Sequence, residues 1–131
     1  MGNANVMNVN VGLLAGTTPV GTSTIFGFYA PSDAVGGGIT ITKVDYCSNE
    51  AIAAASAPVY TCVKLTSAGA INGTIATVLG SANWTAGTSR VGTLSTVFVD
   101  AGEAVAFVWN QTAANGQLPK INAAVQYVMG R

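Results

Sequence analysis

The sequence predicts an all-β fold, namely a single-domain antiparallel β-sandwich of the jelly-roll type over residues 1–131. Apolar residues alternate with polar ones in short runs, and Gly, Pro, Ser, Thr and Asn separate the runs, as in strands joined by turns. The chain has no heptad pattern and no internal repeat. Its length suits one domain, and about eight strands suit two packed sheets. An immunoglobulin-like sandwich is the alternative, but the usual spacing of its cysteines and tryptophan is absent.

The predicted strands follow the alternating runs in order. They are residues 5–14, 24–30, 39–46, 59–66, 74–79, 92–99, 104–110 and 121–129. The last two have the clearest apolar faces, which we expect to line the core. These faces consist of Val105, Phe107 and Trp109 in one strand and of Ile121, Ala123, Val125, Tyr127 and Met129 in the other.

A tight turn is predicted at Asp100-Ala101-Gly102-Glu103, where Gly102 stands at a position that often needs a positive φ. The residues on either side, 97–99 and 105–109, are then expected to pair as a hairpin. Two stretches, 16–23 and 31–38, are predicted as exposed loops.

One short helix is predicted near residues 49–57. Ser48 and Asn49 can cap its start, Glu50 is an early acid, an alanine-rich run follows, and Pro58 ends it. We expect it to cover one end of the sandwich.

Few residues are charged: five are Lys or Arg, five are Asp or Glu, and none is His. Five dispersed cations do not make the basic face that nucleic-acid binding requires. Without histidine the commonest catalytic base is missing, so we expect no enzyme, no cofactor and no metal site. The N-terminus lacks the pattern of a signal peptide and no run is long enough to cross a membrane, so we expect synthesis in a cytoplasm and no membrane partner.

The composition favours a subunit that packs against other subunits. A surface of Thr, Asn, Ser, Gly and Ala is easier to desolvate than one of Lys and Glu. Attachment to a partner should therefore depend little on salt. With no histidine, stability should be flat between about pH 5 and 8.

Cys47 and Cys62 bracket the predicted helix. If the flanking strands pair as a hairpin, the two residues face each other and a cross-strand disulfide is conceivable. The favoured interpretation is two reduced cysteines that act as small buried apolar groups.

The candidate interaction residues lie in two segments. The N-terminal run has one apolar and one amide face, so residues 1–12 are expected to form either an edge strand or an extended arm that adds to a neighbour's sheet. Trp84, in a loop of small residues, either fills the end of the sandwich or is exposed as a binding anchor. The candidate residues are Asn5, Val6, Asn8, Val9, Asn10, Val11 and Trp84.

The chain resembles the capsid decoration, or cement, proteins of tailed bacteriophages and related small jelly-roll phage structural proteins. The resemblance rests on composition and on the closing pattern, which is Val99-Asp100-Ala101-Gly102-Glu103-Ala104-Val105, then Val108-Trp109-Asn110, then residues 121–128. It implies a homotrimer that binds the major capsid protein and stabilises the shell, located on the capsid surface of the virion.

Two other functions remain open. A receptor- or carbohydrate-binding module of a phage fibre would need Trp84 exposed, with Tyr29, Tyr46 or Tyr60 nearby. A self-assembling coat subunit would form closed shells from the purified protein.

Overall fold

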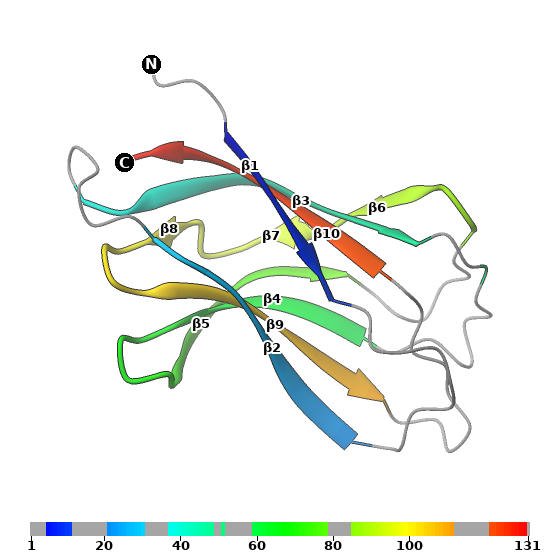
Figure 1. Ribbon diagram of the computed structural model, residues 1–131, viewed down its shortest axis with the longest axis horizontal. Helices are drawn as coiled ribbons and strands as arrows, with labels where there is room; N and C mark the ends of the chain where they lie inside the picture. Colours follow the sequence, from blue (N-terminus) through cyan, green and yellow to red (C-terminus); the bar gives the residue numbers. More distant parts are fainter. Residues whose placement is uncertain are drawn as a thin grey trace.

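The fold is known from a computed structural model that describes residues 5–11, 21–30, 37–48, 51, 59–78, 85–111 and 121–130. These residues form two packed antiparallel sheets (Figure 1). The first sheet holds β1 (Asn5–Asn10), β10 (Ile121–Met129), β3 (Ile39–Ser48), β6 (Ser89–Val91) and β8 (Phe98–Val99). The second sheet holds β2 (Gly21–Tyr29), β9 (Ala104–Gln111), β4 (Val59–Leu65), β5 (Ile71–Val78) and β7 (Thr93–Leu94).

The strand order confirms the predicted jelly roll. β1 pairs with β10, β2 pairs with β9, β3 pairs with β6 and β8, and β4 pairs with β5. This nesting of early strands with late ones, shared between two sheets, is the jelly-roll arrangement.

The core lies between the sheets and contains most of the predicted residues. Val105, Phe107 and Trp109 of β9 are buried there, and they face the buried residues of β10. Those residues are Ile121, Ala123 and Val125, with Tyr127 partly buried beside them. Met129 was expected in the core, but its side chain is 40% exposed because it lies at the end of the strand.

The predicted strand at 92–99 is wrong as a single element. Gly92 N–H donates to Val44 O in the first sheet, whereas Ser95 N–H donates to Ile75 O in the second, both at 2.8 Å. β6, β7 and β8 are therefore short pieces that alternate between the sheets. The segment closes the β3 edge of one sheet and the β5 edge of the other, which leaves little free edge on this side.

The hairpin predicted around the Asp100–Glu103 turn is also wrong, although the turn itself is present. Gly102 has φ +86° and Glu103 N–H donates to Asp100 O at 3.0 Å, as in a type II turn. However, β8 pairs with β3 in the first sheet, and β9 pairs with β2 and β4 in the second. The turn connects the two sheets instead of two paired strands.

Two other predicted segments need correction. The loop expected at 16–23 ends earlier, because β2 begins at Gly21. In the loop expected at 31–38, Gly38 is buried instead of exposed. The helix predicted near 49–57 lies outside the described residues except for Ala51, which is in neither a helix nor a strand.

The two cysteines do not face each other, and both thiols are free. β3 and β4 lie in different sheets, so the hairpin that would have brought the cysteines together does not form. Cys62 is fully buried in the core, and burial raises the pKa of its thiol. Cys47 is half-buried on the outer side of β3, between the inward-facing Tyr46 and Ser48.

This difference predicts selective thiol chemistry. A disulfide reagent such as Ellman's reagent should modify Cys47 in the native protein and Cys62 only after unfolding, because Cys47 is partly accessible to solvent and Cys62 is fully buried. Cys47→Ser should then show no fast reaction without denaturant. Rapid modification of native Cys47→Ser would contradict the buried position of Cys62.

Candidate interaction surfaces

The N-terminal candidate residues lie on β1, which pairs with β10 and with no other described strand. Val6 is 53% exposed and Met7 is 37% exposed. Asn8 is also exposed, and its Oδ1 accepts a hydrogen bond from Asn122 Nδ2 at 3.1 Å. Asn5 and Asn10, at the two ends of the strand, have exposed side chains as well.

The other two N-terminal candidate residues, Val9 and Val11, face inward. Val9 packs against the core and Val11 is fully buried in it. Their side chains anchor the strand and are not available to a partner, so contact through β1 must use its backbone and its exposed side chains.

The backbone N–H and C=O groups of successive β1 residues point alternately toward β10 and away from it. Val11 N–H donates to Ile121 O at 2.9 Å, and the ladder continues through Val9 opposite Ala123 and Met7 opposite Val125. In an antiparallel ladder, successive residues direct their N–H and C=O groups to opposite sides. The backbone groups of Val6 and Asn8 therefore point away from β10.

The structure describes only part of the aromatic set expected around Trp84. Trp84 itself lies outside the described residues. Tyr46 and Tyr60 are fully buried in the core, with ring centroids 6.1 Å apart, and burial raises the pKa of both hydroxyls. Only Tyr29 of the three is exposed, so two of the proposed sugar-stacking partners are unavailable.

The outer face of the second sheet is a further candidate surface that the sequence analysis did not identify. A bulge between Phe26 and Phe28 turns both Phe26 and Tyr29 outward, and their ring centroids lie 4.9 Å apart. The bulge requires Gly27, because a Cβ there would lie 2.7 Å from Val105 O. Phe26 is 48% exposed and Tyr29 is 63% exposed.

These aromatic residues border a small apolar cluster across the middle of the same face. Phe26 pairs with Ala106 and Tyr29 with Ala104, and these alanines pair in turn with the next strand, β4. The cluster consists of Val63, Leu65, Ala104 and Ala106, with Val108 packed against it. On the far side, Ile71 lies opposite Leu65 and is 58% exposed.

No described charged residue lies on this outer face. Lys43 and Asp45 form an ion pair on β3, and Arg90 is on β6, all in the first sheet. Asp100 and Glu103 lie in the turn, and Lys64 points between the sheets. We call the surface on which Phe26, Tyr29 and Ile71 are exposed, around this buried cluster, the outer apolar face. It can be desolvated without burying an ionised group.

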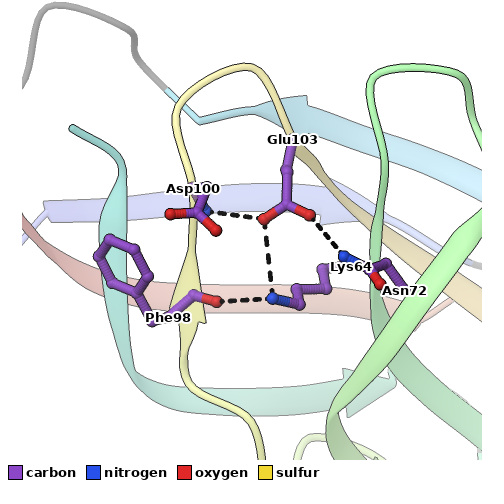
Figure 2. A network of polar contacts seen from close by, with 5 residues as sticks. All are labelled: Lys64, Asn72, Phe98, Asp100 and Glu103. Carbon is purple, nitrogen blue, oxygen red and sulfur yellow. Dashed lines mark hydrogen bonds and ion pairs between the residues drawn. The ribbon is translucent and has the colours of Figure 1, made fainter.

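A polar network closes one end of the sandwich (Figure 2). Lys64 Nζ lies 3.6 Å from Glu103 Oε1 and donates to Phe98 O at 3.4 Å, so it links β4 to β8 in the other sheet. Glu103 Oε1 also accepts from Asp100 N–H, and its Oε2 accepts from Asn72 Nδ2, both at 2.9 Å. The Lys64 and Glu103 side chains are only 13% and 12% exposed.

The network sets the ionisation of Glu103. Partial burial raises the pKa of this carboxyl, but the hydrogen bonds from Asn72 and Asp100 and the charge of Lys64 outweigh burial. The net result is a pKa below the ordinary value, so Glu103 is ionised at neutral pH. Lys64 Nζ and both Glu103 carboxylate oxygens have partners, which indicates a structural connection between the sheets.

The described residues contain no cluster of three or more His, Cys, Asp or Glu side chains that could hold a metal ion. The same part of the chain contains no helix long and apolar enough to span a membrane. What the described surface offers is the edge of β1 and the outer apolar face.

No family model matches the chain, and no curated protein matches it in sequence. Among solved structures, a chain titled "Cyanophage Pam1 capsid asymmetric unit" has a TM-score of 0.59 at 16% identity, over 99% of this chain and 86% of that chain. A chain of infectious bursal disease virus, Gx strain, has a TM-score of 0.45 at 12% identity, over 98% of this chain and 32% of that chain.

A chain of arabinose-bound MgGH51 α-L-arabinofuranosidase has a TM-score of 0.39 at 18% identity, over 98% of this chain and 22% of that chain. The latter two similarities are too weak to support an argument. The first shows that this chain shares its fold with a chain of a cyanophage capsid structure.

Proposed function

We propose that this protein is a non-enzymatic structural protein of a virion, a decoration or cement protein that self-associates on the capsid and stabilises it by binding the major capsid protein. The observation that carries the proposal is the uncharged outer apolar face, on which Phe26, Tyr29 and Ile71 are exposed around a buried apolar cluster. Exposed apolar surface of this kind is typical of a protein-protein interface. The fold shared with a chain of a cyanophage capsid supports the virion setting.

The expected assembly is a homotrimer on the shell. A standard interface buries about 800 Å² on each partner. A subunit that contacts several neighbours on a lattice binds firmly even when each single contact is weak, because the contacts act together. The proposed location is the capsid surface. Aromatic residues are favoured at the centres of such interfaces, so we expect Phe26 and Tyr29 to make the main contacts with the shell.

Binding to capsid shells tests the proposal. Shells assembled from the major capsid protein of the same virus should co-sediment with the purified chain. The double variant Phe26→Ser/Tyr29→Ser should weaken binding at least about tenfold, because it removes two aromatic contacts. Val91→Ser is the matched control: Val91 is 58% exposed on the first sheet, and its replacement should leave binding unchanged. Absence of wild-type binding would overturn the proposal.

Salt gives an independent prediction. Because no described charge lies on the outer apolar face, raising NaCl from about 0.1 to 0.5 M should change the affinity for shells less than about threefold. The measurement is the bound fraction in the same co-sedimentation assay at each salt concentration. Release of the protein by moderate salt would show that ion pairs hold it and that another surface is responsible.

A further inference from the structure

The edge of β1 differs from the other sheet edges in the described part of the chain. β6, β7 and β8 are only two or three residues long, and a bulge interrupts β2. β1 has six residues in continuous register with β10, and it contains no proline and no charge. Bulges, short strands, prolines and charges are the usual devices that prevent edge-to-edge pairing, and β1 has none of them.

We propose that β1 pairs with β1 of a second copy, antiparallel and across a two-fold axis at Met7. This inference does not depend on the proposed virion function. The outward backbone groups of Val6 would bond those of Asn8 in the other copy, and the reverse bonds follow by symmetry. An isologous contact of this kind is the commonest way in which identical chains associate.

The strand is self-complementary in this register. The axis places Met7 opposite Met7 of the second copy at a position without hydrogen bonds, where side chains approach most closely. Met7 is the apolar side chain of β1 that faces the core side while remaining 37% exposed, so the pairing would cover it. Because β1 has no charged residue, no like charges meet across the axis.

The pairing would extend the first sheet through both copies. Backbone hydrogen bonds would supply the attachment, as they do when an extended strand adds to a sheet edge. On a shell, this two-fold contact would join subunits of different trimers. In solution it would join two free chains.

Cross-linking tests the geometry. In a Cys47→Ser background, Met7→Cys should form a disulfide-linked dimer under mild oxidation, because α-carbons at such a pair lie about 4.5 Å apart, within disulfide range. Ser89→Cys, exposed on the short edge strand β6, is the matched control and should cross-link at least about tenfold more slowly. Equal rates for the two variants would overturn the proposal.

A second variant tests the hydrogen bonds. Val6→Pro removes an N–H that points away from β10, so it should leave the melting temperature nearly unchanged. It should raise the dimer dissociation constant, measured by sedimentation velocity, at least about tenfold, because symmetry doubles the loss. A wild-type chain that is monomeric at millimolar concentration would overturn the inference. The inference would also be overturned if the wild type formed no dimer but Val6→Pro bound shells more weakly. The edge of β1 would then bind a different protein.

Discussion

Gly38→Ala should lower the free energy of unfolding by about 4 kcal/mol, which is at the upper end for a single substitution. Gly38 has φ +85°, and a Cβ at this position would lie 2.2 Å from Val99 O. The next atoms, Asp100 Cα and Ala101 N, are at 3.0 and 3.1 Å. All three belong to the backbone, so no side chain can rotate away to make room.

The location of Gly38 adds to the expected loss. Gly38 precedes β3, and its carbonyl accepts a hydrogen bond from Gly130 N–H at 2.9 Å. Moving the chain to relieve the clash would disturb the pairing of β3 with β8. It would also disturb the hydrogen bond to Gly130, which directly follows β10. Both contacts hold the same end of the first sheet.

Two other glycines separate the steric clash from the backbone strain. Gly69 has φ +85° and Gly102 has φ +86°, and a Cβ at either would meet nothing within 4 Å. Gly69→Ala and Gly102→Ala should each lower stability by about 1–2 kcal/mol, the cost of the left-handed conformation alone. Urea unfolding of the three variants gives the comparison. If Gly38→Ala falls within about 1 kcal/mol of Gly69→Ala, the close approach to Val99 is not rigid.

The alternating pattern predicted individual strands well where the strand lies in one sheet throughout. The predicted strand at 121–129 has the bounds of β10, because its inward residues keep a period of two and one face is buried. The turn at Asp100–Glu103 was also predictable, since Gly102 supplies the positive φ that the turn needs.

The same pattern could not show which sheet a strand joins. The sequence predicted a single strand at residues 92–99, but hydrogen bonds from Gly92 and Ser95 go to opposite sheets. That choice depends on contacts with β3 and β5, which are distant in sequence. For the same reason the sequence suggested a hairpin where the chain passes between sheets.

The outer apolar face was missed because a bulge changes the parity of β2. Phe26 and Tyr29 are three residues apart, so strict alternation would place them on opposite faces. Gly27 was the available signal, since an isolated glycine in a strand often marks a bulge. A bulge read at Gly27 would have placed both aromatic residues on one surface. β3 contains a similar irregularity, where Ile41 and Val44 both face the core.

Loss of the Lys64–Glu103 connection should destabilise the protein far more than loss of the ion pair on the surface. Lys64→Gln should lower the free energy of unfolding at pH 7 by about 2 kcal/mol, because it leaves a largely buried carboxylate without its cation. Lys43→Gln is the matched control. The Lys43–Asp45 pair is shorter, at 3.1 Å, but the Lys43 side chain is 44% exposed, so solvent screens the pair and the loss should stay below about 0.5 kcal/mol. Equal losses of stability in the two variants would mean that the distance between the charged atoms matters more than the burial of the pair.

Glu103 also predicts how the protein responds to acid. Its folded-state pKa is lowered, so its contribution is fully present above the unfolded value of about 4.3 and is lost as the pH falls through the folded value. Melting temperatures should therefore be flat between about pH 5 and 8 and fall below about pH 4. Glu103→Gln should be less stable than the wild type at pH 7, and the difference should shrink toward pH 2. A difference that stayed constant over this range would show that the Glu103 charge contributes nothing to folding.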